Sequence, residues 1–347
     1  MRCSVVILNW NGADMLRRYL PSVVEHTVGM SNVEVVVADN GSTDESLSLL
    51  AAEFPGVRTI TLDKNYGFAE GYNKAIALID SEYTVLLNSD VEVTHGWLLP
   101  ILDYMDAHRE VAAVQPKIHS WLRKDYFEHA GAAGGYLDML GYPFCRGRVL
   151  GKVEKDEGQY NSLAEVLWTS GACMCIRTNI YKESGGLDGE FFAHMEEIDL
   201  CWRLCCRGYK LVCLPDSTVY HLGGGALGYE NPRKTYLNFR NNLLMIYKNM
   251  PTKRLWWVLF LRFALDYVAV LQFFLTAQPK QAWAVVKARK DYHRMKPHFA
   301  GKRKDNLRLT TTPYPVGIRH CSVFCLAIKH VIRSKEQGAR TMDEWNI

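Results

Sequence analysis

The sequence lacks the features that would assign it to nucleic-acid-binding or secreted proteins. Its 347 residues carry a formal net charge of only +4, which is too weak to indicate a nucleic-acid partner by itself. It has little that resembles a secretory leader, because its first apolar run, Val5–Leu8, is followed at once by polar residues. With 48% hydrophobic and 22% charged residues, it is expected to be an ordinary globular protein of the cytoplasm.

The ten cysteines lack the CxxC spacing that is typical of zinc sites. We expect thiols in a reducing compartment rather than disulfides. Cys173 and Cys175 would share one face of a strand, and Cys201 and Cys205 one face of a helix. This leaves a zinc site open, but the spacing favours buried small hydrophobic residues.

The N-terminal part of the chain alternates short apolar runs with helical patterns. Strands are predicted at Ser4–Leu8, Val33–Ala38, Val57–Leu62 and Tyr83–Leu87, and helices at Ala13–Thr27, Glu45–Phe54 and Asn73–Ile79. This alternation predicts βαβ units and therefore an α/β fold with a mainly parallel sheet and flanking helices. Because single cores stop growing near ~250–300 residues, an appendage is expected beside one large domain.

Polar residues directly follow each of these strands. The clusters are Asn9–Gly12, Asp39–Asp44, Asn65–Gly71 and Asn88–Asp90. Parallel strands bring their carboxyl ends to one edge of a sheet, where open α/β sheets bind ligands. A polar turn would explain any one cluster, but all of them together favour a nucleotide or phosphate site. In such a site Asp39 can accept from a base N–H, and Asn88 and Asp90 offer oxygen ligands to a hard divalent cation.

Segments in these clusters carry a specific resemblance. VVILNWN, VVADNGSTDES, NYGFAEGYNKAI and LLNSDVEV, in this order and spacing, resemble family 2 glycosyltransferases of the GT-A fold, above all the rhamnosyltransferase-like branch of bacterial polysaccharide assembly. With the motifs below, the resemblance covers Cys3–Asn249. It implies a dTDP- or UDP-sugar donor, with Asp39 on the base and Asp90 on a divalent Mg²⁺ or Mn²⁺. Asn88 stands where many relatives have the first Asp of a DxD pair, so this chain offers one carboxylate fewer.

The donor site implied by this resemblance combines the strand-end clusters with a small-residue turn inside the predicted strand Leu167–Ile176. Small residues let a bulky ligand lie against the backbone, and glycines let it approach a diphosphate. Arg240 is included because it faces phosphate in relatives, although an arginine on a helix can equally form a cap or an ion pair. The expected contacts are Asn9, Asn11, Asp39, Asn40, Ser42, Asn65, Gly67, Gly71, Asn73, Asn88, Ser170, Gly171 and Arg240.

The segment Phe191–Tyr209 is expected to begin a helix at Glu196, with further acids at Glu197 and Asp199. The helix macrodipole favours anions there, so capping alone would explain them. Neighbouring carboxylates repel each other, so their pKa values differ. Such a difference can adjust the pKa of one carboxyl group for the role of a general base. The segment resembles the family's EDxDLxxR motif, in which the second acid is the general base. The resemblance assigns this role to Glu197, which replaces an Asp, with Glu196 as the second candidate.

His221 follows the predicted strand Ser217–Tyr220. A lone His is usually structural, but in the family a His at this position contacts metal or diphosphate, so we expect it to join Asp90 at the metal. The run Gly223–Gly228 matches GxGxxG but lacks the returning strand and the acidic residue of a dinucleotide site. It is predicted to form a flap over the diphosphate instead.

Residues His119–Leu163 have weak periodicity and are rich in glycine, tyrosine and charge. We predict a variable loop that helps to shape the acceptor pocket. Its Glu128 and His129 could be taken as a catalytic pair, but the favoured interpretation is that they are solvated loop residues.

The apolar run Leu255–Leu275 has the length of a membrane span. Its central Arg262 and Asp266 cost about 5–7 kcal/mol together on the insertion scale, which cancels the gain from its apolar residues. A spanning helix is therefore not expected. The basic residues on both sides, nine of them within Lys280–Lys304, favour a helix on an anionic membrane surface. A helix packed on the catalytic domain is the alternative.

The predicted organisation is a GT-A catalytic domain over residues 1–249, a membrane-associating helical segment over 250–304 and a tail over 305–347. The predicted activity is inverting, metal-assisted transfer of a sugar to a hydroxyl of a lipid-linked glycan, at the inner face of the cell membrane. The alternative is a catalytically inactive nucleotide-sugar-binding scaffold. A nucleotidyltransferase is disfavoured because the sequence has no early Gly-rich loop with Arg or Lys, and homo-oligomerisation is left open.

Overall fold

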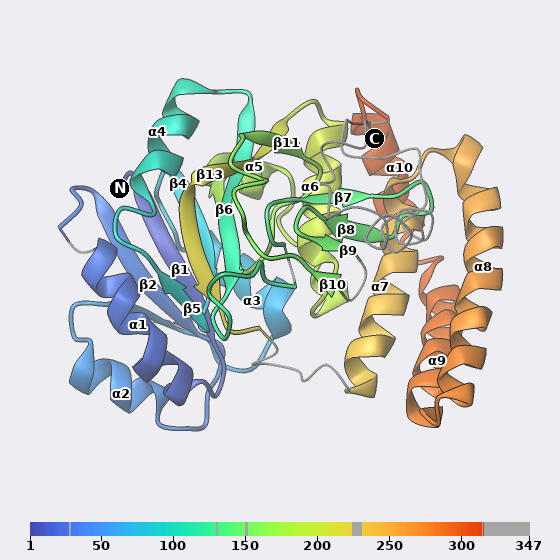
Figure 1. Ribbon diagram of the computed structural model, residues 1–347, viewed down its shortest axis with the longest axis horizontal. Helices are drawn as coiled ribbons and strands as arrows, with labels where there is room; N and C mark the ends of the chain where they lie inside the picture. Colours follow the sequence, from blue (N-terminus) through green and yellow to red (C-terminus); the bar gives the residue numbers. More distant parts are fainter. Residues whose placement is uncertain (28, 130, 150–151, 224–230, 314, 316–347) are drawn as a thin grey trace.

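The computed structural model describes residues 1–27, 29–129, 131–149, 152–223, 231–313 and 315 (Figure 1). A central sheet has helices on both faces, and the C-terminal helices gather at one side of the molecule. Among the described residues the sheet has nine strands in the order β11-β13-β6-β12-β4-β1-β2-β3, with β5 paired to β13. This confirms the predicted α/β class with a helical C-terminal extension.

The apolar runs in the first half of the chain predict the larger of the two parallel parts of the sheet, the other being the pair of β6 and β13. In sheet order the strands of the larger part are β3 (Arg58–Thr61), β2 (Val33–Asp39), β1 (Cys3–Asn9) and β4 (Tyr83–Asn88). Each predicted strand is confirmed to within one residue at either end. Alternate side chains enter different hydrophobic clusters, with Val5 and Ile7 in one and Val6 in the other. Both faces of the sheet are therefore buried, as continuous apolar strands require.

Helices from different parts of the chain cover the two faces. One face is covered by α1 (Ala13–Thr27), α2 (Ser46–Glu53) and α4 (Leu99–Ala107), and the other by α3 (Gly67–Ala77), α5 (Thr178–Glu183) and α6 (Glu196–Cys206). The prediction for α3 was wrong at its start, because the helix begins at Gly67 rather than at Asn73. The Phe192 carbonyl oxygen accepts from the N–H groups of Phe68 and Ala69, so a distant segment satisfies the first turn.

The remaining strands bring the second half of the chain to the end of β4. They are β12 (Cys173–Arg177), antiparallel to β4, then β6 (Val111–Ser120), β13 (Lys210–His221), β11 (Ala164–Val166) and β5 (Val91–Val93). Only the second half of the predicted strand Leu167–Ile176 is a strand. The Asn88 N–H donates to the carbonyl oxygen of Ala172 over 3.0 Å, so the turn before β12 lies beside the end of β4.

The described residues of the segment 119–163 do not form an irregular loop, contrary to the prediction of a variable loop. Among the described residues a second sheet forms there from β7 (Gly135–Leu137), β8 (Pro143–Cys145), β9 (Arg148–Val149) and β10 (Lys152–Val153). Phe127, Tyr136 and Tyr160 enter the main hydrophobic core. Strands of two or three residues joined by turns leave almost no periodicity, which is why the sequence pattern did not reveal them.

The C-terminal helices are α7 (Pro232–Asn249), α8 (Thr252–Leu275), α9 (Pro279–Met295) and α10 (Ala300–Leu309). Buried ion pairs join α7 to the catalytic half, because Lys248 Nζ lies 2.6 Å from Asp188 and 2.7 Å from Asp199. Arg203 lies 3.0 Å from the same Asp199 carboxylate. Among the described helices, α8 alone is long and apolar enough to cross a membrane by length and composition. The domain boundary after residue 249 stays a prediction.

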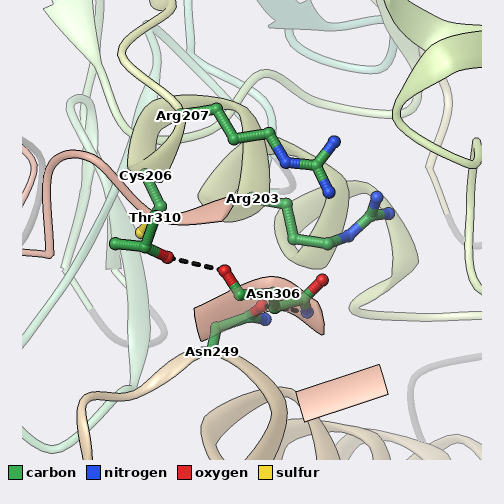
Figure 2. Close-up of a pocket in the computed structure, with 6 residues that line it drawn as sticks. All are labelled: Arg203, Cys206, Arg207, Asn249, Asn306 and Thr310. Atoms are coloured by element: carbon green, nitrogen blue, oxygen red, sulfur yellow. Dashed lines mark hydrogen bonds between the residues drawn. The ribbon is translucent and has the colours of Figure 1, made fainter. Parts of the chain in front are cut away.

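A pocket at the C-terminal end of α6 marks where α10 packs (Figure 2). The Thr310 hydroxyl donates to the Asn306 carbonyl oxygen over 2.8 Å at its edge. The lining residues are Arg203, Cys206, Arg207, Asn249, Asn306 and Thr310. Since Glu196 and Glu197 lie at the other end of α6, this pocket belongs to the packing of the tail and not to the strand-end site.

Candidate active site

The ends of β1 and β2 form the first part of the site. Asn9 and Asp39 are neighbours across the two strands and are fully buried. The Asn9 amide donates to Asp39 over 3.2 Å and to the Ser42 hydroxyl over 3.3 Å, and the Ser42 N–H donates to Asp39 over 2.9 Å. The Asn11 N–H donates to the same hydroxyl over 2.9 Å. Asn9 Oδ1 is buried without a partner among the described residues, and a ligand N–H could satisfy it.

Asn40 connects this cluster with the start of α3. Its Nδ2 donates to the Gly67 carbonyl oxygen over 3.0 Å and to Asn65 Oδ1 over 3.2 Å. A Cβ at Gly71 would lie 3.0 Å from the Asn40 amide and 2.9 Å from the Leu8 side chain. Only glycine therefore lets α3 approach the end of β1 this closely. The structure brings Asn40, Asn65, Gly67 and Gly71 together at one edge of the sheet.

Gly67 also joins the strand ends to the catalytic helix. Its φ is +78°, and a Cβ there would lie 2.5 Å from the ring of Phe192. From the other side, a Cβ at Gly171 would lie 3.3 Å from the ring of Phe68 and 3.8 Å from the Cβ of Glu197. Two glycines therefore bring the start of α3 and the start of α6 into contact.

The structure does not bring Asn73 into this group. Its Nδ2 donates to the Leu187 carbonyl oxygen over 2.8 Å, and its Oδ1 accepts from the Tyr181 hydroxyl over 2.7 Å and from the Leu187 N–H over 3.0 Å. The amide is saturated by these groups and by Glu70. Asn73 therefore connects α3 with the segment before α6. Both polar atoms of its side chain are occupied by protein groups, which leaves neither for a nucleotide-sugar donor.

Asp90 lies beyond the end of β4 against His221 of β13. His221 Nε2 is 3.1 Å from Asp90 Oδ1 and 3.4 Å from Asn88 Nδ2, and its Nδ1 is 3.5 Å from Glu128. Burial disfavours a charged imidazole, but Asp90 and Glu128 more than offset this and raise the pKa of His221 to about 10. Burial also opposes ionisation of Asp90, yet His221 holds the pKa of this carboxyl below its usual value. Of the predicted glycine flap, only Gly223 lies within the described residues.

Glu128 was expected to be solvated, and the structure corrects this. It is buried beside His221, whereas His129 accepts from the Arg148 guanidinium over 2.7 Å. Burial and the charge of Arg148 lower the pKa of His129 to about 4. The two neighbours therefore have different partners. A carboxylate on the second nitrogen of a ligating His fixes the orientation of its ring, and the place of Glu128 suits this role.

The residues at the end of β4 fit a divalent cation that substrate oxygens complete. In the part of the chain that the structure describes, no three His, Cys, Asp or Glu side chains are arranged to hold a metal ion by themselves, and the described cysteines are buried free thiols. Asp90 Oδ1 and His221 Nε2 lie 3.1 Å apart, so one divalent cation could take both as ligands. Two protein ligands leave the other positions to phosphate oxygens and water.

The loop before α6 has an unusual backbone conformation. Phe192, His194 and Met195 have φ values of 66°, 70° and 73°, a region that costs of order 1–3 kcal/mol for each non-glycine residue. Asn241 of α7 holds this loop, because its amide donates to three loop carbonyl oxygens over 3.0, 2.9 and 2.7 Å. Such strain persists only where the surroundings enforce it, and it often marks a functional site.

Arg240 serves the same loop. Its guanidinium donates to the carbonyl oxygens of Glu190 and Phe191 over 3.2 and 3.1 Å, and its Nε donates to Asn241 Oδ1 over 2.8 Å. In this position Arg240 orients the amide that holds the loop. Its expected contact with phosphate stays a prediction.

The helix α6 begins at Glu196, as predicted, and buries two adjacent carboxyl groups. One oxygen each of Glu196 and Glu197 is buried with no hydrogen-bond partner among the described residues. Burial raises the pKa of Glu197 to about 6, and burial together with Glu197 raises the pKa of Glu196 well above its usual value. Asp199 differs, because Lys248 and Arg203 neutralise it. With a pKa of about 6, Glu197 can release its proton below neutral pH, as a base must.

The turn at Ser170 and Gly171 lies between Glu197 and the end of β4. Gln115 Oε1 accepts from the Ser170 N–H over 2.8 Å, and the Ser170 hydroxyl accepts from the Ala172 N–H over 3.2 Å. The Ala172 carbonyl oxygen in turn accepts from the N–H at the end of β4, and Gly171 faces Glu197. One short turn therefore connects the candidate metal ligands with the candidate base.

Sequence reasoning missed the hydrogen bonds from Asn241 to the Phe192–Met195 loop, and it set Glu128 aside. Left-handed residues that are not glycine give no compositional signal, so the loop could not be found. Asn241 stands next to the predicted Arg240, which is the one clue that the sequence offers. The partner of Glu128 lies on a distant strand and depends on the tertiary fold.

Replacing Asn241 by Ala leaves buried carbonyl oxygens of the loop without their donor. We expect the free energy of unfolding to fall by about 1–3 kcal/mol, as for other buried groups that lose a hydrogen bond. Urea unfolding measures this. Asn238→Ala on the same helix is the control, because the Asn238 side chain has no hydrogen bond to the described residues. Equal stability of the two variants would contradict the role given to Asn241.

Known proteins share both sequence and fold with this chain. N-acetylglucosaminyl-diphospho-decaprenol L-rhamnosyltransferase of Mycobacterium tuberculosis is 27% identical over 235 residues, which cover 62% of this chain and 75% of that protein. Rhamnosyltransferase WbbL of Escherichia coli K12 is 22% identical over 260 residues, covering 72% of this chain and 93% of that protein.

Solved structures and a family model complete the comparison. GalNAc-T7 with UDP, GalNAc and Mn²⁺ has a TM-score of 0.56 at 17% identity, covering 87% of this chain and 56% of that one. Residues 1–349 of S. aureus TarS with UDP-GlcNAc have a TM-score of 0.53 at 17% identity, covering 89% and 90%. At this identity the likeness shows the fold alone, and it confirms the GT-A class. The model of glycosyl transferase family 2 matches residues 4–183, just over half of the sequence. The chain therefore belongs to glycosyl transferase family 2.

Proposed function

We propose that this protein is an inverting glycosyltransferase that moves a sugar from a nucleotide-diphosphate donor to a hydroxyl group of a glycan acceptor. One observation carries the proposal. The ionisable Glu197 carboxyl, with its raised pKa, lies across the Gly171 turn from the strand end that presents Asp90. A candidate base and a candidate site for the leaving diphosphate are thus joined by one short turn, an arrangement that a binding scaffold does not need.

The donor base and ribose are proposed to lie over the ends of β1 and β2. Asp39 is held by Asn9 and Ser42 with its carboxylate fixed in place, which suits it to accept from a base N–H. The close approach of α3 at Gly67 and Gly71 leaves backbone next to the diphosphate. The names of the rhamnosyltransferase relatives support a dTDP-rhamnose donor. A UDP-hexose is the other candidate, since solved structures of the same fold hold UDP and UDP-GlcNAc.

Glu197 is proposed to take the proton of the acceptor hydroxyl as that oxygen attacks the anomeric carbon. General-base catalysis of this kind contributes about 10²–10⁴-fold to the rate. Attack from the side opposite the diphosphate inverts the anomeric centre. Glu196 stays the second candidate for the base, with a carboxyl group whose pKa burial and Glu197 raise well above its usual value.

A divalent Mg²⁺ or Mn²⁺ at Asp90 and His221 would stabilise the charge that develops on the leaving diphosphate. Asp90 supplies the carboxylate and His221 the ring nitrogen, which must first release its proton. The Glu128 carboxylate lies 3.5 Å from the opposite ring nitrogen, a place from which it can orient the imidazole ring. Asn88 adds no charge, so Asp90 is the residue on which cation binding depends most.

The acceptor is proposed to be a lipid-linked glycan of cell-surface polysaccharide synthesis, met at the inner face of the cell membrane. The name of the mycobacterial relative includes diphospho-decaprenol, which supports a lipid-linked acceptor. The second candidate function is an inactive nucleotide-sugar-binding scaffold. Asn88 in place of an acid and Glu197 in place of Asp favour it, and donor turnover distinguishes the two.

Glu197→Gln should lower kcat for the donor by about 10²–10⁴-fold with little change in its KM, because the base is lost and the binding contacts remain. In the unsubstituted enzyme kcat should rise as the pH increases through about 6, where Glu197 loses its proton, and the variant should lack this rise. A thermal-shift screen over nucleotide sugars with metal first identifies the donor, since a ligand at 100 times its Kd adds about 2.7 kcal/mol. The exposed Glu183→Gln is the control. Full turnover by Glu197→Gln would rule out the proposed base.

Asp90→Asn should abolish turnover and lower the affinity for Mn²⁺ by more than about tenfold, because the only charged oxygen ligand from β4 is removed. Calorimetry with Mn²⁺ and a nucleoside diphosphate measures binding without any catalysis. The exposed Asp80→Asn is the matched control. Normal turnover or unchanged Mn²⁺ binding in Asp90→Asn would place the metal elsewhere.

A further inference from the structure

The charged residues in the middle of α8 point into the protein. Arg262 and Asp266 are almost fully buried, and Asp266 is paired with Arg289 of α9. Arg262 donates to the Leu140 carbonyl oxygen over 3.3 Å and to Asn242 of α7. The two charges that weighed against a membrane-spanning helix in the sequence are therefore paired inside the protein.

The opposite side of α8 is apolar and open to solvent. Its exposed side chains recur at helical spacing and define what we name the α8 face: Trp256, Phe260, Phe263, Tyr267, Leu271 and Phe274. Soluble proteins rarely leave a continuous apolar surface of this length in water, and such surfaces mark contacts with membranes or partners. The helix is thus amphipathic in the reverse sense, with its charges inside and its apolar side chains outside.

The helix α9 runs beside α8 (Figure 1) and exposes a row of cations. Lys280, Lys287, Lys290 and Arg294 are exposed at helical spacing, and Lys253 is exposed at the start of α8. Cations beside an apolar face match the headgroups and acyl chains of an anionic bilayer. Interfaces between proteins are instead poor in lysine.

We propose that α8 lies in the plane of an anionic membrane surface, with the α8 face among the acyl chains and the cations of α9 at the headgroups. A spanning orientation is disfavoured because α9 is bound to α8 through Arg289 and would enter the bilayer with it. Each cation carried to the centre of the hydrocarbon disfavours insertion by about 10²-fold. An in-plane helix leaves all of these cations in water.

Docking of the α8 face would also fix how the active site meets the membrane. Arg262 binds Asn242, which is the neighbour of the Asn241 that holds the catalytic loop. The docking helix and the loop are therefore connected through α7 by direct side-chain contacts. The inference rests on the proposed function in one respect, because docking would bring the proposed transferase to a lipid-linked acceptor.

Flotation of the purified full-length chain with vesicles tests the proposal. We expect binding to vesicles of phosphatidylcholine mixed with phosphatidylglycerol, and weaker binding to phosphatidylcholine alone. Phe260→Glu combined with Leu271→Glu should lower binding by about 10²-fold, because two inserted side chains become charged. Leu78→Glu combined with Leu122→Glu is the matched control. Its positions are 57% and 70% exposed, against 67% and 59% for the tested pair, and it should bind like the unsubstituted chain.

Three results would overturn the proposal. The first is equal binding by the two glutamate pairs, and the second is retention of the chain in the membrane after alkaline carbonate extraction, which indicates a span. The third is a lipid-free dimer that only the Phe260 and Leu271 substitutions dissociate, because this assigns the α8 face to a second copy. Phe260→Ser with Leu271→Ser repeats the test without added charge, and thermal unfolding confirms that each variant is folded. Flotation needs no donor, so its failure and the failure of the transferase proposal are distinguishable.

Discussion

Two adjacent carboxyl groups, those of Glu196 and Glu197, are buried where α6 begins, and much of the surrounding structure keeps them there. An ionised carboxylate that is buried without a partner is unfavourable, and the pKa values of both groups rise in consequence. The helix macrodipole stabilises an anion at the N-terminus by only about 0.3–1 kcal/mol. The rest of the support comes from the left-handed loop that Asn241 holds and from the cations that neutralise Asp199. A carboxyl group held in this way can exchange a proton near neutral pH, which a solvated one does poorly.

The second constraint is close approach between halves of the chain that are far apart in sequence. Gly67 and Gly71 bring α3 against the end of β1 and against Phe192. Gly171 lets the turn beside the end of β4 lie against Phe68 of α3 and Glu197 of α6. A methyl group at Gly67 or Gly71 would meet a neighbour at 3.0 Å or less. The proposed donor side and the proposed catalytic side of the site approach closely because these glycines have no side chains. In addition, Asn40 donates to the Gly67 carbonyl oxygen, and the Ser170 hydroxyl accepts from the Ala172 N–H within the Gly171 turn.

The sequence predicted the donor side of the site better than its catalytic side, for a physical reason. Buried parallel strands are continuous apolar runs, and the polar residues that follow them must meet at one edge, so Asn9, Asp39 and Asp90 could be placed without coordinates. The left-handed Phe192–Met195 loop, the early start of α3 and the partner of Glu128 depend on contacts between distant segments. The sequence counted Arg262 and Asp266 as costs of inserting a spanning helix, whereas both are turned inward, where Asp266 pairs with Arg289 of α9.

The central claim is that Glu197 takes a proton from the acceptor on the side of the sugar opposite the diphosphate. The most direct test is the anomeric configuration of the product, determined by NMR with the donor that the chain turns over. A single displacement assisted by Glu197 predicts a glycosidic bond whose configuration is inverted relative to the donor. A product with retained configuration would contradict this role, because retention requires a second displacement or attack from the face of the leaving group.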